Sequence, residues 1–382
     1  MADLEIPIID FSGFYSDEPN RKQAVVDQVR KSCLYNGFFQ IINHSVPLAQ
    51  QDGALSAAKK FFTLPQEEKD KVSKNNNTWN RGYEMLRSQI LEEGTQPELK
   101  EGFYIGAYVA VSSHTPFSTL GVSAPSYAPS LPDAGFADPN SFSDLPATHP
   151  YFINKKLNSG PNQWPEGLGS DLGSFKTGTM DYYNSTFNLA SDLLRVIALS
   201  LDLEENFFAQ FADGAVATMR LLHYPSQPKD AEEKLTRGIG AHTDFGAITM
   251  LLQDEVDGLQ VWDQRNQTWI DVEPTKGGLV VNLGNLMQRW TNEKYKSNVH
   301  RVINKSGKER YSIPVFLSGN PDFLVECIPT CRAPEEPAKF EPITVQQAVS
   351  AAYAESYGRA QKYKQGLEKA IDSQTQPQTV QV

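Results

Sequence analysis

The stretch from Ala217 to Phe316 is built of short apolar runs of strand length, and this pattern constrains the fold more than any other feature of the chain. Turn-forming residues separate the runs at roughly the spacing that is typical of an all-β sandwich or barrel. We therefore predict a sheet-based core for this part of the sequence. The runs are MRLLHY, AITMLL, GLQVW, GLVVNL and RYSIPVFL.

Helical patterns flank this β region on both sides. Apolar residues recur at helical spacing after Phe175, which predicts a long amphipathic helix with one face packed on the core. A further helix is expected over Pro19–Asn36, where Gly37 is a natural end. The other expected elements are helices at 52–62 and 344–367, a short helix that starts at Pro65, and strands at 6–11, 38–42 and 102–106.

The chain has 382 residues, which is long for one core, but sheet-based barrels and sandwiches often form a single unit of this size. We predict one domain over residues 1–372 and a polar, disordered tail at 373–382. Within the domain we expect an N-terminal region of helices and strands at 1–106 and an inserted loop or lid at 107–162. A long helix with the β core at 163–330 and a C-terminal helix at 331–372 follow.

The insertion at 107–162 differs in composition from the rest of the chain. Seven prolines fall between Ala107 and Pro150, so neither a regular helix nor a central strand can form there. The segment is rich in aromatic residues and has no Lys or Arg before Lys155. A loop of this kind usually covers something apolar, which favours a lid over a medium-sized, apolar or aromatic substrate. The alternative is a disordered surface insertion.

Charge and cysteine content restrict the partners and the compartment. The formal net charge is −11, which argues against a broad nucleic-acid surface and against attachment to anionic lipid. Cys33, Cys327 and Cys331 follow no framework spacing, so we expect reduced thiols in a cytoplasmic protein. No apolar run is long enough to span a bilayer, and the acidic N-terminus does not resemble a secretory signal. We expect a cytoplasmic monomer that acts on a small molecule.

The candidate chemistry begins with His242-Thr243-Asp244, in a strand-like stretch over Gly238–Met250. Residues i and i+2 of a strand point to the same face, so the imidazole and the carboxylate would project together. This is the first requirement for two ligands of one metal ion. Taken alone, the tripeptide favours a solvated polar pair on a surface strand.

A second imidazole strengthens the case for a metal site. His300 lies in SNVHRV, another short strand pattern far along the chain. Two histidines and one carboxylate form the facial set of non-haem iron(II) oxygenases, which leaves three coordination positions open. A structural zinc site would need four ligands, usually with thiolates. We therefore predict a site for iron(II) formed by His242, Asp244 and His300.

Arg310 and Ser312 share one face of a third strand pattern, RYSIPVF. The flanking run is apolar, so this guanidinium is expected to point into the barrel, where a buried arginine needs an anion. Its fork matches a carboxylate through two hydrogen bonds, and the serine hydroxyl can add a third. An internal ion pair, or simple exposure of Arg310, is the alternative interpretation.

The surroundings of these residues resemble a known family. The chain is similar over nearly its whole length, in the expected order, to the isopenicillin-N-synthase-like branch of the 2-oxoglutarate and iron(II)-dependent dioxygenases. The matching segments are IPIIDFS, GFFQIINHSV, FFTLPQEEK, RGYEML, KEGFYIG, PNQWPE, GAHTDFGAITMLLQDEVDGLQVWD, GGLVVNLGNLMQRWTNEKYKSNVHRV and RYSIPVF.

The resemblance implies a mainly β fold with a helical flank, whose core is a double-stranded β-helix, the cupin-like jelly roll. It implies that His242, Asp244 and His300 bind the iron, and that Arg310 and Ser312 bind the distal carboxylate of 2-oxoglutarate. Tyr224 matches a tyrosine that also reaches this co-substrate, and Phe316 would line the substrate pocket.

The implied activity is oxidation of a small organic molecule by dioxygen with iron(II) and 2-oxoglutarate. Hydroxylation, desaturation and ring chemistry are all open, and the substrate is expected to be a largely apolar or aromatic metabolite of specialised metabolism. Some members of the family use the same iron ligands without 2-oxoglutarate, so an oxidase of that kind is the alternative. A zinc hydrolase would give no reason for Arg310 and Ser312. A non-catalytic binding protein on the same fold would be expected to lack at least one metal ligand, yet all three are present.

Overall fold

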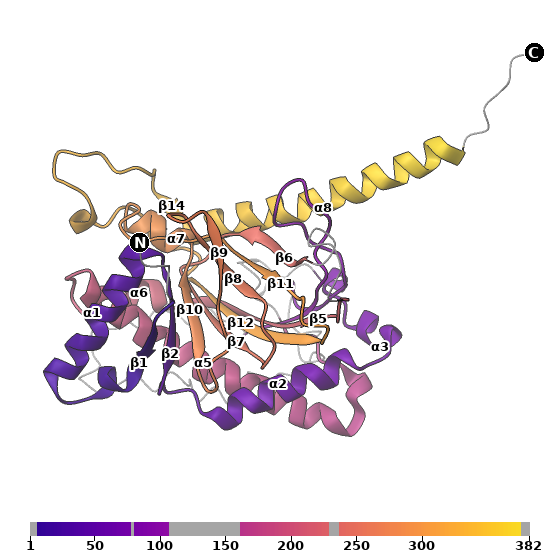
Figure 1. Ribbon diagram of the computed structural model, residues 1–382, viewed down its shortest axis with the longest axis horizontal. Helices are drawn as coiled ribbons and strands as arrows, with labels where there is room; N and C mark the ends of the chain where they lie inside the picture. The colour runs from indigo at the N-terminus through magenta and orange to yellow at the C-terminus, as the bar shows by residue number, and fades with distance from the viewer. Residues whose placement is uncertain (1–5, 78–79, 107–160, 229–236, 376–382) are drawn as a thin grey trace, which may run out of the picture.

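The protein is described by a computed structural model that covers residues 6–77, 80–106, 161–228 and 237–375 (Figure 1). The insertion expected at 107–162 therefore lies outside the described residues, apart from Pro161 and Asn162. The same holds for most of the expected tail, because the last helix continues to Thr375. Within the described part of the chain, no helix is long and apolar enough to cross a membrane.

Two sheets form the centre of the molecule, a larger mixed one and a smaller antiparallel one (Figure 1). In sheet order, the eight-stranded sheet contains β1 (Ile8–Asp10), β2 (Phe38–Ile42), β10 (Leu279–Leu283), β7 (Ile248–Gln253), β12 (Arg310–Gly319), β5 (Val216–Tyr224), β4 (Glu101–Ile105) and β3 (Gly82–Glu84). The four-stranded sheet contains β6 (Arg237–His242), β11 (His300–Ile303), β8 (Leu259–Asp263) and β9 (Thr268–Asp271). The short strands β13 (Leu324–Val325) and β14 (Ile343–Thr344) pair with each other. The structure thus has the predicted sheet-rich core with a helical flank, as expected for a double-stranded β-helix.

Side-chain alternation on the strands of the larger sheet separates two apolar cores. On β12, Ile313, Val315 and Leu317 pack into the larger core, which lies against the helices. The residues that alternate with them, namely Ser312, Pro314 and Phe316, line a cavity on the other face. Because successive side chains of a strand point to opposite faces, one face of β12 packs into the stabilising core and the other lines the cavity.

Helices cover the outer face of the larger sheet (Figure 1). The long helix begins at Leu172, close to its expected start, and ends at Ser200. It buries a continuous apolar face. The described helices are α1 (Pro19–Tyr35), α2 (Leu48–Phe62), α3 (Gln66–Lys71), α5 (Leu172–Ser200), α6 (Ala209–Ala212), α7 (Asn285–Trp290) and α8 (Val345–Thr375).

The end of α1 shows how one residue fixes the entry into β2. Gly37 has a φ of +75°, a conformation that favours glycine, and its amide donates a hydrogen bond to the carbonyl of Ser32. A Cβ atom at Gly37 would lie 1.9 Å from the carbonyl oxygen of Lys296. The sequence analysis placed this helix end correctly.

The prediction of a single strand over Gly238–Met250 is wrong. Strand β6 ends at His242 in the smaller sheet, and β7 begins at Ile248 in the larger sheet. The chain changes sheets between them, and Gly246 lies so close to β12 that a Cβ atom would be 2.8 Å from the carbonyl oxygen of Leu317. Asp244 therefore lies on the connection between the sheets, and not on a strand. Helix α2 also differs from expectation, because it begins four residues earlier, at Leu48.

Candidate metal centre

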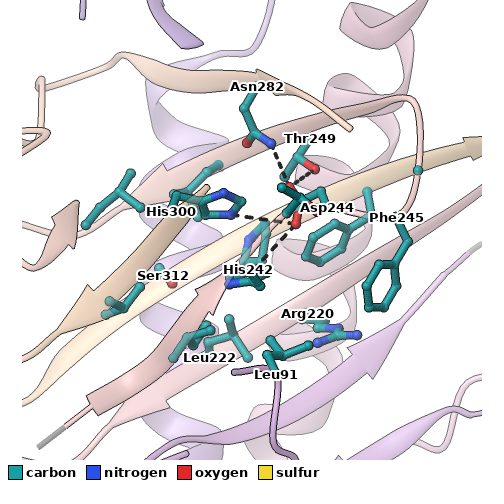
Figure 2. A pocket seen from close by; sticks show the side chains of 18 of the residues that line it. Leu91, Arg220, Leu222, His242, Asp244, Phe245, Thr249, Asn282, His300 and Ser312 are labelled. Atoms are coloured by element: carbon teal, nitrogen blue, oxygen red, sulfur yellow. Dashed lines mark hydrogen bonds and ion pairs between the residues drawn. The ribbon is translucent and has the colours of Figure 1, made fainter. Parts of the chain in front are cut away.

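Three metal-ligating side chains meet at one point between the sheets (Figure 2). His242 ends β6, His300 begins β11, and these two residues are cross-strand partners in the smaller sheet. Asp244 Oδ1 lies 3.7 Å from the Nε2 atom of each histidine. One ligand atom from each of the three residues lies within 4.8 Å of the others. The structure thus brings together all three residues that the sequence singled out.

Both imidazoles are oriented by backbone carbonyls. His242 Nδ1 lies 2.8 Å from the carbonyl oxygen of Gly240, and His300 Nδ1 lies 3.2 Å from that of Asn298. A carbonyl can only accept a hydrogen bond, so each Nδ1 must carry the proton and donate it. The Nε2 lone pairs are left free and point to the common centre. This is the usual arrangement of metal-binding histidines.

Asp244 is held through its other carboxylate oxygen. Oδ2 accepts hydrogen bonds from Thr249 Oγ1 at 2.6 Å and from Asn282 Nδ2 at 2.7 Å. Thr249 on β7 and Asn282 on β10 are cross-strand partners, so two strands of the larger sheet orient this carboxylate (Figure 2). Neither residue was predicted from the sequence to belong to the site. Their signal was weak, since each is a lone polar residue inside an apolar strand.

The protonation states suit a metal ion. Burial lowers the pKa of His242 to about 3, and the neighbouring His300 adds to the effect. Burial opposes ionisation of Asp244, but the two histidines and the hydrogen bonds from Asn282 and Thr249 outweigh it and lower its pKa. The site therefore presents a neutral imidazole and a carboxylate anion at neutral pH. With two nitrogens and one oxygen, this donor set fits iron(II) and leaves room for further ligands.

A second cluster lies at the end of β12 that is nearer to Tyr224. Arg310 is fully buried, and its Cζ atom lies 4.9 Å from the centre of the Tyr224 ring. The Tyr224 hydroxyl lies 3.3 Å from Ser312 Oγ. Arg310 and Tyr224 are cross-strand partners, and Ser312 follows on the same face of β12. The three residues expected to bind 2-oxoglutarate are thus adjacent.

Arg310 has no acidic partner among the described residues. Its Nε donates to the carbonyl of Val256 at 3.2 Å and its Nη2 donates to Gln253 Oε1 at 2.7 Å, both neutral acceptors. Its Nη1 is buried without a hydrogen-bond partner. A buried guanidinium with a free donor is a binding site for an anion. Of the alternatives to an anion site, exposure of Arg310 is wrong because the residue is fully buried, and an internal ion pair is not seen among the described residues.

One cavity joins both clusters. It is lined by the three candidate metal ligands, by Arg310, Ser312 and Tyr224, and by Phe316, the residue expected at the substrate. Apolar side chains such as Phe38, Leu222 and Val302 form much of the remaining wall. Gln89, Arg220 and Tyr353 also line it, and the sequence analysis did not assign them to the site. Arg220 could have been found, because it lies at even strand spacing from Tyr224.

Two family descriptions match the chain. Residues 6–129 match the N-terminal region described as "non-haem dioxygenase in morphine synthesis", and residues 215–319 match the 2OG-Fe(II) oxygenase superfamily. The second match includes the candidate metal ligands, the cluster around Arg310, and Phe316.

Relatives and solved structures agree with these matches. The 2-oxoglutarate-Fe(II) type oxidoreductase hxnY of Emericella nidulans is 53% identical over 371 residues, which cover 97% of this chain and 96% of that protein. A 2-oxoglutarate-Fe(II) type oxidoreductase of Aspergillus fumigatus is 43% identical over 95% of this chain and 98% of its own length. The crystal structure of a full-length Neurospora crassa protein in complex with alpha-KG and thymine has a TM-score of 0.70 at 29% identity. The match covers 91% of this chain and 96% of that one.

Proposed function

The chain belongs to the 2-oxoglutarate and iron(II)-dependent oxygenases, and from this premise we propose which of its residues perform the reaction. The enzyme is an Fe(II)/2-oxoglutarate-dependent dioxygenase, with 2-oxoglutarate and dioxygen as co-substrates. We assign the iron to His242, Asp244 and His300. The observation that supports this assignment is the convergence of two lone-pair-bearing Nε2 atoms and one carboxylate oxygen at one point.

The bound iron supplies the activation of dioxygen, and the protein orients the reactants around it. The carbonyls behind each imidazole keep both rings in the ligating tautomer. Thr249 and Asn282 hold Asp244 Oδ2, so that Oδ1 is the oxygen that would bind the metal. The apolar wall formed by side chains such as Leu222 and Val302 keeps the cavity poor in water, which strengthens each electrostatic contact inside it.

We assign the distal carboxylate of 2-oxoglutarate to Arg310, Ser312 and Tyr224. The buried, unpaired Nη1 of Arg310 supports this assignment, as do the two hydroxyl groups beside the guanidinium. Together they can donate several charge-assisted hydrogen bonds to one carboxylate. The location of the cluster in the same cavity as the candidate metal ligands lets one co-substrate reach both.

For the organic substrate, the proposal is a small, largely apolar or aromatic metabolite that lies against Phe316. The largely apolar cavity wall supports it, and the similar Neurospora crassa protein has been crystallised with the small ring compound thymine. Hydroxylation, desaturation and ring formation remain the candidate reactions, and the mass of the product separates them. A role in specialised metabolism, a cytoplasmic monomer without nucleic-acid or membrane partners, and the single domain over 1–372 remain predictions.

The experiment that tests the assignment compares Asp244→Ala with Asp271→Ala. Asp271 is an exposed carboxylate on β9 that accepts a hydrogen bond from Gln260, away from the cavity. After anaerobic loading, elemental analysis and succinate release from 2-oxoglutarate are measured. We expect Asp244→Ala to lose iron and succinate release, because its only anionic ligand is gone, while Asp271→Ala retains both. Full iron content and activity in Asp244→Ala would refute the assignment.

A further inference from the structure

A second buried arginine faces the cavity, apart from the cluster around Arg310. Arg220 lies on β5, is only 7% exposed, and shares its strand face with Leu222 and Tyr224. Its Nε is buried without a hydrogen-bond partner. The single hydrogen bond seen for this guanidinium in the described structure is a long one of 3.3 Å, from Nη2 to the Tyr353 hydroxyl. Most of its five donors therefore remain available to a ligand.

The charges around Arg220 are unbalanced. The buried carboxylate of Glu84, which interacts electrostatically with Arg220, already binds the ammonium groups of both Lys74 and Lys100 and accepts hydrogen bonds from Tyr104 and Tyr357. The single negative charge of Glu84 is thus outnumbered by three positive charges, those of the two lysines and of Arg220. Glu98 is a further buried acid, and burial raises its pKa to about 7, so it adds only a partial charge at neutral pH, while the Asp244 carboxylate, which also lines the cavity, faces the two histidines. This excess of positive charge next to the cavity favours an electron-rich ligand.

The two arginines lie at different places along the cavity. The antiparallel register pairs Arg310 with Tyr224 and Ser312 with Leu222, so that Arg220 comes next, opposite Pro314. Four residues of β12 thus separate the two positions, which is roughly 13 Å along a strand. Figure 2 shows Arg220 and Ser312 on opposite sides of His242. A co-substrate bound at Arg310 therefore leaves Arg220 free for a second molecule.

Aromatic rings hold Arg220 in place and shape the space beside it. Its Cζ atom lies 4.4 Å from the centre of the Tyr104 ring and 5.1 Å from that of Phe316. Phe245, the residue after Asp244, packs edge-on against Tyr353 at 5.5 Å and also faces the cavity. A flat or compact ring fits between such walls, with its polar end towards the guanidinium.

We propose that Arg220 determines substrate specificity by binding an acceptor oxygen of a small ring compound, either a carboxylate or a ring carbonyl. The excess positive charge favours the carboxylate. This inference rests on the proposed function, because it places the organic substrate in the cavity that also holds iron and 2-oxoglutarate. It adds a polar binding contact for a substrate that the composition of the insertion alone predicted to be apolar.

The test uses the full chain, loaded with iron(II) under argon and saturated with 2-oxoglutarate, so that the cluster around Arg310 is occupied. Two matched series serve as probes in calorimetric titrations: cyclohexanecarboxylate, cyclohexanone and cyclohexylamine, and benzoate, acetophenone and benzylamine. We expect the acids to bind most tightly, the ketones less tightly and the ammonium compounds least. Arg220→Gln should weaken binding of the acids by about 10- to 100-fold, because a charge-assisted contact is lost. Arg220→Lys should give an intermediate loss.

Arg195→Gln is the control, since Arg195 lies on α5 in ion pairs with Asp192 and Glu205, outside the residues that line the cavity. This variant should bind the probes as the wild type does. Acid and ketone binding that does not change in Arg220→Gln would overturn the proposal, as would equal binding of acids and amines. If the wild type binds 2-oxoglutarate but none of the acids or ketones, the proposal also fails. Failure to bind 2-oxoglutarate, measured first, would instead refute the proposed function.

Discussion

At the scale of single residues, the two oxygens of Asp244 have different tasks. Oδ1 faces the two histidines, whereas Oδ2 is held by Thr249 and Asn282. A carboxylate with two free oxygens could rotate or bind a metal through both. Fixing one oxygen from the larger sheet therefore sets the direction of the other. Groups in this supporting position usually change metal affinity when they are removed.

The variant Thr249→Val tests this positioning role. Valine has nearly the shape of threonine but cannot donate the 2.6 Å hydrogen bond to Asp244. We expect iron(II) affinity to fall roughly 10-fold, within the range seen for such partners. The measurement is a competition titration with a metal chelator. Thr268→Val, at an exposed position on β9, is the matched control and should bind iron normally. Unaltered affinity in Thr249→Val would show that Asn282 alone orients the carboxylate.

Arg310 gives a second prediction at this scale. Arg310→Ala removes the guanidinium with a free, buried Nη1, so 2-oxoglutarate should bind about 10- to 100-fold more weakly. Arg310→Lys keeps the charge but loses the planar fork, and should recover part of the affinity. The dissociation constant, measured on iron-loaded protein, distinguishes these cases. Arg265→Ala, at an exposed arginine beyond β8, should leave it unchanged, and an unchanged value for Arg310→Ala would remove this residue from the role.

At the scale of elements, one carboxylate joins the segment 85–100 to the edge of the smaller sheet and another holds the segment together internally. Glu98 Oε1 accepts a hydrogen bond of 2.6 Å from the amide of Leu91, and Glu92 Oε2 accepts one of 2.9 Å from the amide of Ala241 on β6. Gln89 and Leu91 of this segment line the cavity. Burial raises the pKa of Glu98 to about 7, so its protonation is linked to the stability of the fold.

The sign of this linkage follows from the two states. Between pH 4.5 and 7 the unfolded chain releases the proton of Glu98 while the native state keeps it, so this group stabilises the wild type less as pH rises. Glu98→Gln mimics the protonated form. We expect the variant to gain stability relative to the wild type across this window, by roughly 3 kcal/mol at most, and the difference to level off above pH 7. Urea unfolding at several pH values measures it.

Glu93→Gln controls for loss of a charge, because Glu93 is exposed in the same segment. Its stability difference from the wild type should not follow the same curve. A difference for Glu98→Gln that is independent of pH would show that Glu98 is ionised in the native state.

The elements also show where sequence patterns predict structure and where they do not. The alternation on RYSIPVF predicted a strand with Arg310 and Ser312 on one face, and β12 has it. The same reasoning placed His242 and Asp244 on one strand, which is wrong, because the chain changes sheets between them. Their convergence depends on a close approach at Gly246 that no local pattern encodes. Thr249 and Asn282 act through a pairing between distant strands, which a single sequence does not reveal.

At the scale of the whole molecule, the site joins the two sheets. His242 and His300 belong to the smaller sheet, whereas Thr249, Asn282 and Arg310 belong to the larger one. A metal ion at the histidines and Asp244, together with a co-substrate at Arg310, as proposed, would connect both layers. Such ligands bind the native state and not the unfolded chain, so they stabilise the fold as a whole.

We expect iron(II) and 2-oxoglutarate to raise the melting temperature of one cooperative transition. A ligand at 100 times its dissociation constant adds about 2.7 kcal/mol, which for a chain of this size is roughly 3 °C. Anaerobic calorimetry measures the shift, and hydrogen exchange locates it. Protection should increase in strands of both sheets. If protection increases only in β6 and β11, the site does not join the layers in this way.

The division of each cavity strand into two faces has a consequence for how such an enzyme can change. On β5, Met219 and Leu221 pack into the larger core, while Leu222 and Tyr224 face the other way, on the side of Arg220. A substitution at Arg220 therefore alters what the cavity accepts without removing a side chain from the core beneath the helices. New specificities can arise by exchange of every second residue, on a scaffold whose remaining residues keep it folded.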